Sequence, residues 1–172
     1  HVFADERIET AEKQTQAWEE HKRQERAKKA GADAVAPSEL DGIIKSLPAL
    51  VRAQKLQRRA ARVGFYWDDI EAVYAKLFEE VDEVREAAQS VELDKLEDEV
   101  GDLLFAGVNL ARFLNIDAEH ALRRANGKFE RRFREVEKRV ALQGADMQAM
   151  SVAELDGIWE AVKRHQDADL QD

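Results

Sequence analysis

The feature that most constrains the fold of this chain is the recurrence of apolar residues at helical spacing along almost its whole length. Such spacing places apolar side chains on one face of an α-helix. The 172 residues include only two prolines and eight glycines, which are the residues that most often interrupt helices. No stretch alternates between apolar and polar residues as a strand would. The sequence therefore predicts an all-α fold built as a helical bundle.

The predicted helices divide the chain into an arm and a bundle. Residues 5–29 read as a helix rich in Glu, Lys, Arg and Gln with few apolar positions, and residues 30–37 are small and loop-like. We therefore expect a helical arm and linker over residues 1–37 and a helical domain over residues 38–172. A domain of that length can bury a hydrophobic core of its own.

Several residues mark expected helix ends within this domain. Gly64 is suited to a Schellman-type stop, in which a residue in the left-handed conformation ends a helix. Asp68 is the expected N-cap of the next helix, and Asp117 is a cap before a long helix over about 118–141. Ser151, with a glutamate three residues later, predicts a capping box at the start of the last helix.

Two acidic pairs stand out on two of the predicted helices. Glu80 and Glu83 form one pair, and Glu99 and Asp102 form the other. Residues three apart lie on neighbouring rows of one side of a helix, so each pair presents two carboxylates together. A lysine precedes each pair by the same interval of four residues. The two helices thus carry one pattern twice.

Each pair lies beside an apolar stripe on its own helix. Counted around the helix axis from Leu77 or Leu96 in the stripe, the first residue of each pair lies at about 60° and the second at about 120°, on the same side. We therefore expect both pairs to border the core without lying in it. The first stripe comprises Ile70, Val73, Tyr74, Leu77, Val81, Val84 and Ala88, and the second comprises Leu93, Leu96, Val100, Leu103, Gly107, Leu110 and Leu114. We also expect the aromatic residues Phe65, Tyr66 and Trp67 to lie in the core at a helix junction.

If the two flanks meet, four carboxylates converge. Two like charges roughly 5 Å apart repel by about 3 kcal/mol at an effective dielectric constant near 20, so four such charges call for a cation. All-oxygen ligation favours a hard divalent ion, and Mg²⁺ is the natural candidate. The alternative is that these carboxylates belong to ordinary solvated acidic faces, since 37% of the chain is charged.

The composition excludes several function classes. The formal net charge of −9 argues against a nucleic-acid polymer as a partner, although it allows a mononucleotide held through a metal. The chain has no cysteine, which excludes disulfides and thiolate metal sites. It has no apolar run near 18 residues and no secretory signal, which predicts a cytoplasmic protein with no membrane partner.

The long helix over about 118–141 carries a cationic pair beside its apolar stripe. Lys128 and Arg132 are four residues apart, a spacing suited to polyphosphate oxygens. The alternative is that these side chains, together with the other cations of this helix, balance the charge of an acidic protein. Spacing alone does not separate the two interpretations.

Five short motifs stand out along the chain. They are Ala53-Gln54-Lys55-Leu56-Gln57, Val63-Gly64-Phe65-x-Trp67, Glu79-Glu80-x-x-Glu83, Glu99-x-Gly101-Asp102-Leu103-Leu104-Phe105 and Ala125-Asn126-x-Lys128-Phe129-x-Arg131-Arg132-Phe133. Together they resemble the motifs of the MazG nucleoside triphosphate pyrophosphohydrolases, and the similarity extends from the first residues to about Lys163. The start His1-Val2-Phe3 resembles the junction after the first of two tandem MazG domains. We therefore expect this chain to be the C-terminal, catalytic half of a two-domain protein.

The resemblance implies an all-α fold that forms a homodimer and hydrolyses nucleoside triphosphates, with broad base tolerance, to monophosphate and pyrophosphate using Mg²⁺. By resemblance, the metal ligands are Glu80, Glu83, Glu99 and Asp102. The positions that contact nucleotide are Lys76, Glu79, Lys95, Lys128, Arg132 and Trp159, with Trp159 toward the base. The number of metal ions, the preferred nucleotide and the choice between dimer and tetramer stay open.

A mechanism consistent with this resemblance places catalysis at Glu79, Glu80 and Glu83. A carboxylate not fully used in ligation, either Glu79 or Glu80, would orient or deprotonate a water for in-line attack on the α-phosphorus. The cationic side chains would stabilise charge on the phosphate oxygens. The chain has no glycine-rich phosphate loop of the Walker type, so a P-loop enzyme is excluded.

Two other interpretations compete with this one. A di-iron carboxylate bundle also uses glutamate pairs on helices, but it needs Glu-x-x-His on two of them, and neither acidic pair here includes a histidine. A non-catalytic helical module could instead regulate or dimerise through the helix over residues 5–29. That module would leave every function intact when Glu83 is replaced by Gln.

Overall fold

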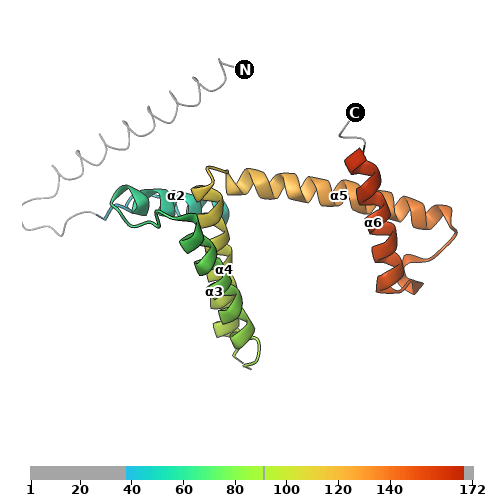
Figure 1. The fold of residues 1–172 in the computed structure, drawn as a ribbon, viewed down its shortest axis with the longest axis horizontal. Helices are drawn as coiled ribbons and strands as arrows, with labels where there is room; N and C mark the ends of the chain where they lie inside the picture. Colours follow the sequence, from blue (N-terminus) through green and yellow to red (C-terminus); the bar gives the residue numbers. More distant parts are fainter. Residues whose placement is uncertain (1–37, 91, 169–172) are drawn as a thin grey trace, which may run out of the picture. The chain divides into compact units, whose positions relative to one another are not determined.

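The computed structural model describes residues 38–90 and 92–168 of the chain. The expected arm and linker over residues 1–37 lie outside the described residues. All regular structure in the described residues is helical, which confirms the predicted all-α fold (Figure 1). The α-helices are α2 (Ala49–Arg62), α3 (Ile70–Ala87), α4 (Leu93–Phe113), α5 (Ala118–Leu142) and α6 (Val152–Ala168), and a short 3₁₀-helix η1 (Met147–Ala149) precedes α6.

The chain divides into two compact units. The described part of the first comprises residues 38–47 and 55–66, and that of the second comprises residues 48–54, 67–90 and 92–168. In the first unit, the Arg59 guanidinium donates hydrogen bonds to two backbone carbonyls of the preceding turn, which holds that turn against α2. All the candidate site residues belong to the second unit.

Helix α2 ends as the sequence predicts. Gly64 adopts a positive φ of 86°. The Phe65 N–H donates to the carbonyl of Ala60 at 3.0 Å and the Gly64 N–H donates to that of Ala61 at 3.1 Å, which together make a Schellman motif. Because a side chain at this φ would be strained, glycine is the residue suited to this position.

The start of α3 differs from the expectation by one residue. The N-cap is Asp69, whose carboxylate accepts a hydrogen bond from the Glu71 N–H at 3.2 Å. The expected cap, Asp68, lies one residue too early, since the backbone leaves the extended conformation only after Asp69. Choosing between two adjacent aspartates needs backbone angles, which the sequence does not supply.

Helices α3 and α4 form an antiparallel hairpin and lie side by side (Figure 1). The connection between them is short, spanning residues 88–92, and short connections favour antiparallel neighbours. The Ser90 hydroxyl donates to the carbonyl of Ala87 at 2.8 Å and so holds the end of α3 in the turn. This hairpin brings the two predicted acidic helices together, as the site requires.

The turn between α4 and α5 is fixed by a buried glutamine. Gln54 is 5% exposed, its side-chain amide donates to the carbonyl of Ile116 at 2.9 Å, and its carbonyl accepts from the Ala118 N–H at 3.2 Å. Asp117 between them caps α5 by accepting from the His120 N–H at 2.8 Å, as predicted. Both polar ends of the buried side chain are therefore satisfied.

Helices α5 and α6 pack on each other through a small apolar cluster of their own. Its buried members are Val136 and Val140 on α5 and Val162 on α6, and the partly buried residues packed against them are Met147, Met150, Leu155, Ile158 and Trp159. The predicted capping box is present, since the Ser151 N–H donates to the Glu154 carboxylate at 2.8 Å. The same carboxylate accepts from the Ser151 hydroxyl, which lowers its pKa.

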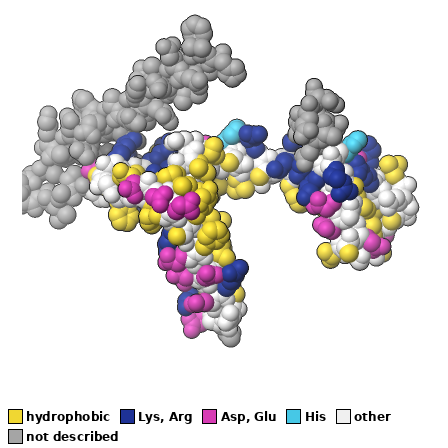
Figure 2. All heavy atoms as spheres, in the orientation of Figure 1, with side chains coloured by type: hydrophobic (Ala, Val, Ile, Leu, Met, Phe, Trp, Pro, Cys, Tyr) yellow, Lys and Arg dark blue, Asp and Glu magenta, His cyan; other side chains and the backbone are white. Residues whose placement is uncertain are grey.

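Much of the expected core is exposed in the described residues. The three aromatic residues after α2 were expected to be buried, but Phe65, Tyr66 and Trp67 are 79%, 54% and 42% exposed, so this prediction is wrong. On the α3–α4 hairpin, Phe78 and Leu104 are also exposed, at 64% and 60%. Figure 2 shows such hydrophobic side chains at the surface among charged ones. These residues have helical spacing, but within residues 38–90 and 92–168 no other side chains bury them.

Candidate metal and nucleotide site

Glu80 occupies a position of α3 where an apolar residue is expected. The buried residues of this helix are Val73, Glu80 and Ala87, which are spaced at intervals of seven. Such spacing forms the straight seam of two helices packed in the manner of a coiled coil. We call the α3 and α4 residues that face each other the α3–α4 seam. Glu80 therefore lies in the core, and the expectation that it only borders the core is wrong.

Helix α4 repeats this arrangement. Its partly buried residues include Leu96, Glu99, Leu103, Ala106 and Leu110, which alternate between spacings of three and four. Glu99 is thus a seam position as well. Two seam positions, one on each helix, are filled by carboxylates instead of apolar side chains.

The seam brings three of the predicted metal ligands together. Glu80, Glu83 and Glu99 each offer a carboxylate oxygen, and these oxygens lie within 4.8 Å of one another. Glu80 is 5% exposed, whereas Glu83 and Glu99 are half-buried. The Oε2 atom of Glu80 is buried and accepts no hydrogen bond. A buried carboxylate oxygen without a partner is costly, so a positive ligand is the natural occupant.

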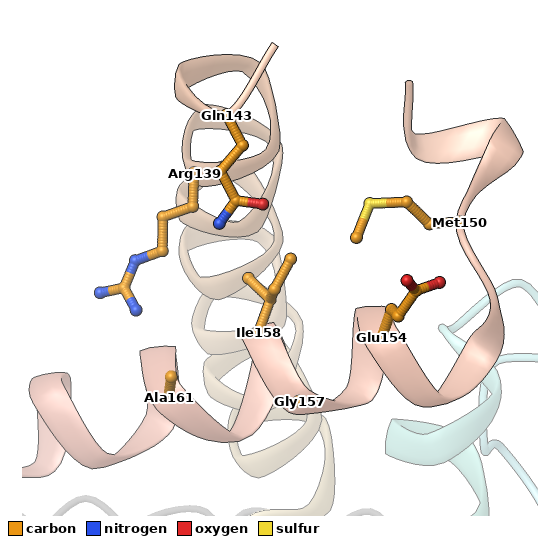
Figure 3. A pocket seen from close by; sticks show the side chains of 7 residues that line it. All are labelled: Arg139, Gln143, Met150, Glu154, Gly157, Ile158 and Ala161. Atoms are coloured by element: carbon orange, nitrogen blue, oxygen red, sulfur yellow. The ribbon is translucent and has the colours of Figure 1, made fainter. Parts of the chain in front are cut away.

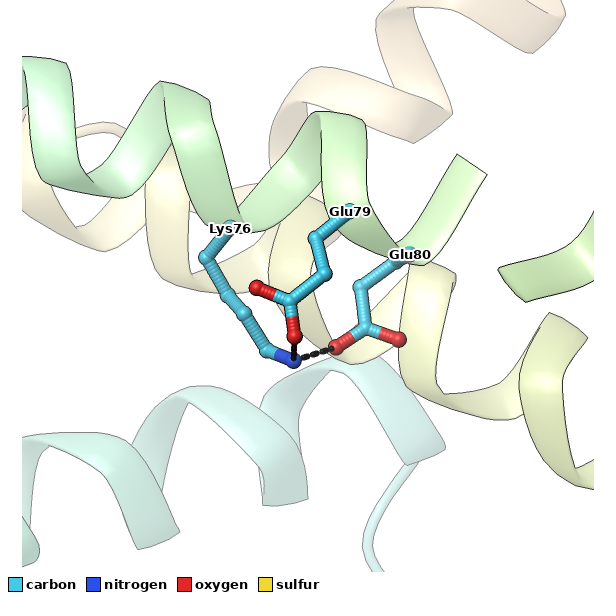
Figure 4. Close-up of polar contacts among 3 residues, drawn as sticks. All are labelled: Lys76, Glu79 and Glu80. Carbon is cyan, nitrogen blue, oxygen red and sulfur yellow. Dashed lines mark hydrogen bonds and ion pairs between the residues drawn. The ribbon is translucent and has the colours of Figure 1, made fainter. Parts of the chain in front are cut away.

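Lys76 contacts this cluster from the preceding turn of α3 (Figure 4). Its ammonium lies 2.8 Å from Glu79 Oε1 and 2.8 Å from Glu80 Oε1. Hydrogen bonds to Glu79 first, and then to Glu80, raise the pKa of Lys76 well above its usual range. Lys76 is therefore charged throughout the physiological pH range.

The electrostatics of Glu83 reflect a gathering of negative charge. The pKa of Glu83 is raised, first by partial burial and then by its interaction with Glu80 and the charges of Glu80 and Glu99. The positive charge of Lys76 opposes this shift and lowers the pKa. A carboxyl group surrounded by like charges binds a proton more readily, and a nearby cation reverses that preference. The three carboxylates thus form one electrostatic unit.

Asp102 does not belong to this three-residue cluster. It lies one turn beyond Glu99 on α4 and is exposed, because the next seam position after Glu99 is Leu103. Lys95, four residues before Glu99, is also exposed. Their roles in metal and nucleotide binding stay predictions.

Trp159, one of the predicted nucleotide-contacting residues, contacts an aromatic pair on α5. The rings of Phe129 and Phe133 stack with centroids 5.8 Å apart, and Phe129 meets Trp159 of α6 at 5.4 Å. Lys128 adjoins Phe129 and is exposed, whereas Arg132 is half-buried. Phe129 and Phe133 are 58% and 39% exposed, which fits an aromatic surface better than a buried stripe.

A separate open groove lies between α5 and α6 (Figure 3). It has a volume of about 390 Å³ and is lined by Arg139, Gln143, Met150, Glu154, Gly157, Ile158 and Ala161. It contains none of the carboxylates or cations of the predicted site. Arg139 is paired with Glu135 at 3.1 Å and Glu154 with Ser151, so the charged groups of the groove already have partners.

The residues of the α3–α4 seam fit a hard divalent cation. All three contributing groups are carboxylates, one of them has a buried oxygen without a hydrogen bond, and oxygen ligands are those that Mg²⁺ prefers. Neither α3 nor α4 contains a histidine, so the Glu-x-x-His pattern of di-iron bundles is absent from these two helices.

A search of residues 38–90 and 92–168 finds no helix with the length and apolar character of a membrane span.

Comparisons with known proteins agree with this chemistry. Residues 69–137 match the MazG nucleotide pyrophosphohydrolase domain. The chain is 50% identical over 172 residues to the nucleoside triphosphate pyrophosphohydrolase of Escherichia coli K12, which covers 99% of this chain and 63% of that protein. It is 42% identical over 146 residues to the nucleoside triphosphate pyrophosphohydrolase/pyrophosphatase MazG of Thermotoga maritima, covering 85% and 54% of the two chains. The chain thus spans less than two thirds of these relatives.

Proposed function

Because the chain belongs, through residues 69–137, to the MazG family of nucleotide pyrophosphohydrolases, we propose that it hydrolyses nucleoside triphosphates to nucleoside monophosphate and pyrophosphate. The reaction depends on Mg²⁺ and accepts a broad range of bases, which suits control of the nucleotide pool. The observation that carries this proposal is the three-carboxylate cluster of the α3–α4 seam. In a purely structural module, a buried carboxylate oxygen without a hydrogen bond would only cost free energy of folding, whereas a bound cation would satisfy it.

The metal ligands in this proposal are Glu80, Glu83 and Glu99, with Asp102 completing the set from the next turn of α4. A divalent cation held there would neutralise charge on the phosphate oxygens and make water more acidic. Glu79 is the carboxylate left for proton transfer, because it is 56% exposed at its side chain and lies outside the cluster. It would orient and deprotonate the attacking water.

The cations supply the rest of the reaction. The attack is in line on the α-phosphorus, and pyrophosphate leaves. Lys76, Lys95, Lys128 and Arg132 stabilise the charge that develops on the phosphate oxygens. Trp159 lies toward the base, where a flat aromatic surface tolerates every base because each has a π-face. This accounts for broad base tolerance without a specific hydrogen-bond pattern.

We also propose that the active form is a homodimer. The α3–α4 hairpin exposes several large apolar side chains, namely those of Tyr74, Phe78, Val100, Leu104 and Phe105. A group of exposed apolar side chains on one element is typical of a protein–protein interface. Burial of these faces against a second copy would remove them from water. Sedimentation equilibrium will give twice the monomer mass, and Phe78→Glu will shift the mass toward that of the monomer. A monomer at micromolar concentration for the unmodified chain would contradict this proposal.

Product analysis tests the proposed reaction. The purified chain is incubated with each of the eight common nucleoside triphosphates, with and without Mg²⁺, and the products are resolved by anion exchange. We expect monophosphate and pyrophosphate, with turnover abolished by a chelator and restored by added Mg²⁺. Diphosphate and inorganic phosphate as products would show that the chemistry is misassigned. A chelator that leaves turnover unchanged would remove the metal from the mechanism.

A further inference from the structure

The ion pair between Lys76 and Glu80 joins a partly exposed cation to the most buried group of the site. The side chain of Lys76 is 34% exposed and that of Glu80 is 6% exposed. Lysine placed four residues before glutamate is the less favourable order for stabilising an isolated helix. Helix stabilisation alone therefore does not account for this pair. The pair is explained better by the charge of the seam.

The seam needs a positive charge when no metal is bound. Glu80 is a buried carboxylate with two further carboxylates within 4.8 Å, and an uncompensated buried charge is strongly destabilising. In residues 38–90 and 92–168, Lys76 forms an ion pair with the most buried member of the cluster, at 2.8 Å from Glu80 Oε1. Its ammonium uses Glu80 Oε1, while Oε2 of the same carboxylate stays without a hydrogen bond.

We propose that Lys76 is the resident counter-ion of the carboxylate cluster and opposes metal binding until a phosphate group draws it away. This rests on the proposed function, since it assumes that the cluster holds a divalent cation. In the metal-free chain, Lys76 neutralises part of the charge that would otherwise attract the cation. Its flexible four-carbon stem and partial exposure allow the ammonium to leave Glu80 for a phosphate oxygen.

The consequence is a coupling between the metal and the nucleotide. A nucleotide whose phosphates pair with Lys76 frees the carboxylates, so the metal binds more tightly when the nucleotide is present. By linkage, the metal must strengthen nucleotide binding by the same factor. A lysine that lay away from the cluster and only contacted phosphate would have little effect on metal affinity in the absence of nucleotide.

The test uses Mn²⁺ alone as the probe, with free Mn²⁺ measured by electron paramagnetic resonance. Lys76→Met removes the charge and keeps an unbranched stem, and we expect it to bind Mn²⁺ about tenfold more tightly than the unmodified chain. Lys76→Arg retains the charge and will bind Mn²⁺ as the unmodified chain does. Lys95→Met is the matched control, because Lys95 also precedes a cluster glutamate by four residues but is exposed. Its Mn²⁺ affinity will change less than about twofold.

Thermal unfolding provides a second readout that does not depend on activity. Without metal, Lys76→Met will unfold at a lower temperature than the unmodified chain, because Glu80 loses its counter-ion, and Mn²⁺ will raise its Tm by more. Far-ultraviolet circular dichroism will verify the helical content of each variant. Unchanged or weaker Mn²⁺ affinity in a folded Lys76→Met variant would overturn this inference alone. Failure of the unmodified chain to bind Mn²⁺ would overturn the proposed metal site, and this inference with it.

Discussion

Replacing Glu80 by Gln will lower turnover by about 10²–10³-fold, while the helical fold stays intact. The substitution keeps the size and shape of the side chain but removes the charge of the most buried carboxylate in the cluster. Because a neutral amide is a weak ligand for a divalent cation, the metal site loses its central member. The effect is measured as kcat under saturating Mg²⁺ and nucleotide.

The stability of this variant separates a catalytic role from a structural one. In the metal-free chain Glu80 costs free energy, since Oε2 is buried without a hydrogen bond. We therefore expect the free energy of unfolding of Glu80→Gln to equal or exceed that of the unmodified chain without metal. Glu86→Gln, an exposed carboxylate on the same helix, is the control and will retain full turnover. Turnover in Glu80→Gln equal to this control would show that the cluster is not the reaction centre.

Replacing Trp159 by Ala will raise KM for nucleoside triphosphates about 5-fold to 150-fold and leave kcat within a few fold. Stacking of a base on an aromatic ring contributes about 1–3 kcal/mol, and the base is remote from the scissile bond in the proposed mechanism. The effect should be similar for purine and pyrimidine nucleotides. Steady-state kinetics with one nucleotide of each kind measures it.

Trp159 also packs against the α5–α6 cluster, so its loss affects stability too. Trp159→Phe provides the control, because a phenyl ring keeps both the packing and a stacking surface next to Phe129. We expect it to restore most of the affinity. If a folded Trp159→Ala variant has the same KM as the unmodified chain, the nucleotide base does not stack on Trp159, and this prediction is contradicted.

The sequence predicts the helices because their signals are local. The Schellman turn at Gly64, the capping box at Ser151 and the cap at Asp117 each depend on residues within one turn of each other. The choice of Asp68 instead of Asp69 fails because two adjacent residues offer the same side chain. Local chemistry thus indicates where helices begin and end to within about a residue.

The arrangement of the site follows from the sequence only in part. The sequence predicts that all four carboxylates converge if the flanks of the two helices meet. The hairpin brings Glu80, Glu83 and Glu99 together, and Asp102 is not part of that cluster. Their burial was missed because the stripes were chosen by hydrophobicity, which passes over a glutamate at a seam position. The alternation of three and four residues through Leu77, Glu80 and Val84 is the signal that would have identified it.

The most direct test of the central claim is hydrolysis of a nucleoside triphosphate in ¹⁸O-labelled water with Mg²⁺, followed by mass spectrometry of the products. The claim is that the carboxylate site directs a water molecule to the α-phosphorus. We therefore predict that the label enters the nucleoside monophosphate and that pyrophosphate stays unlabelled. Label in the pyrophosphate would show attack on the β-phosphorus and would contradict the account of this site.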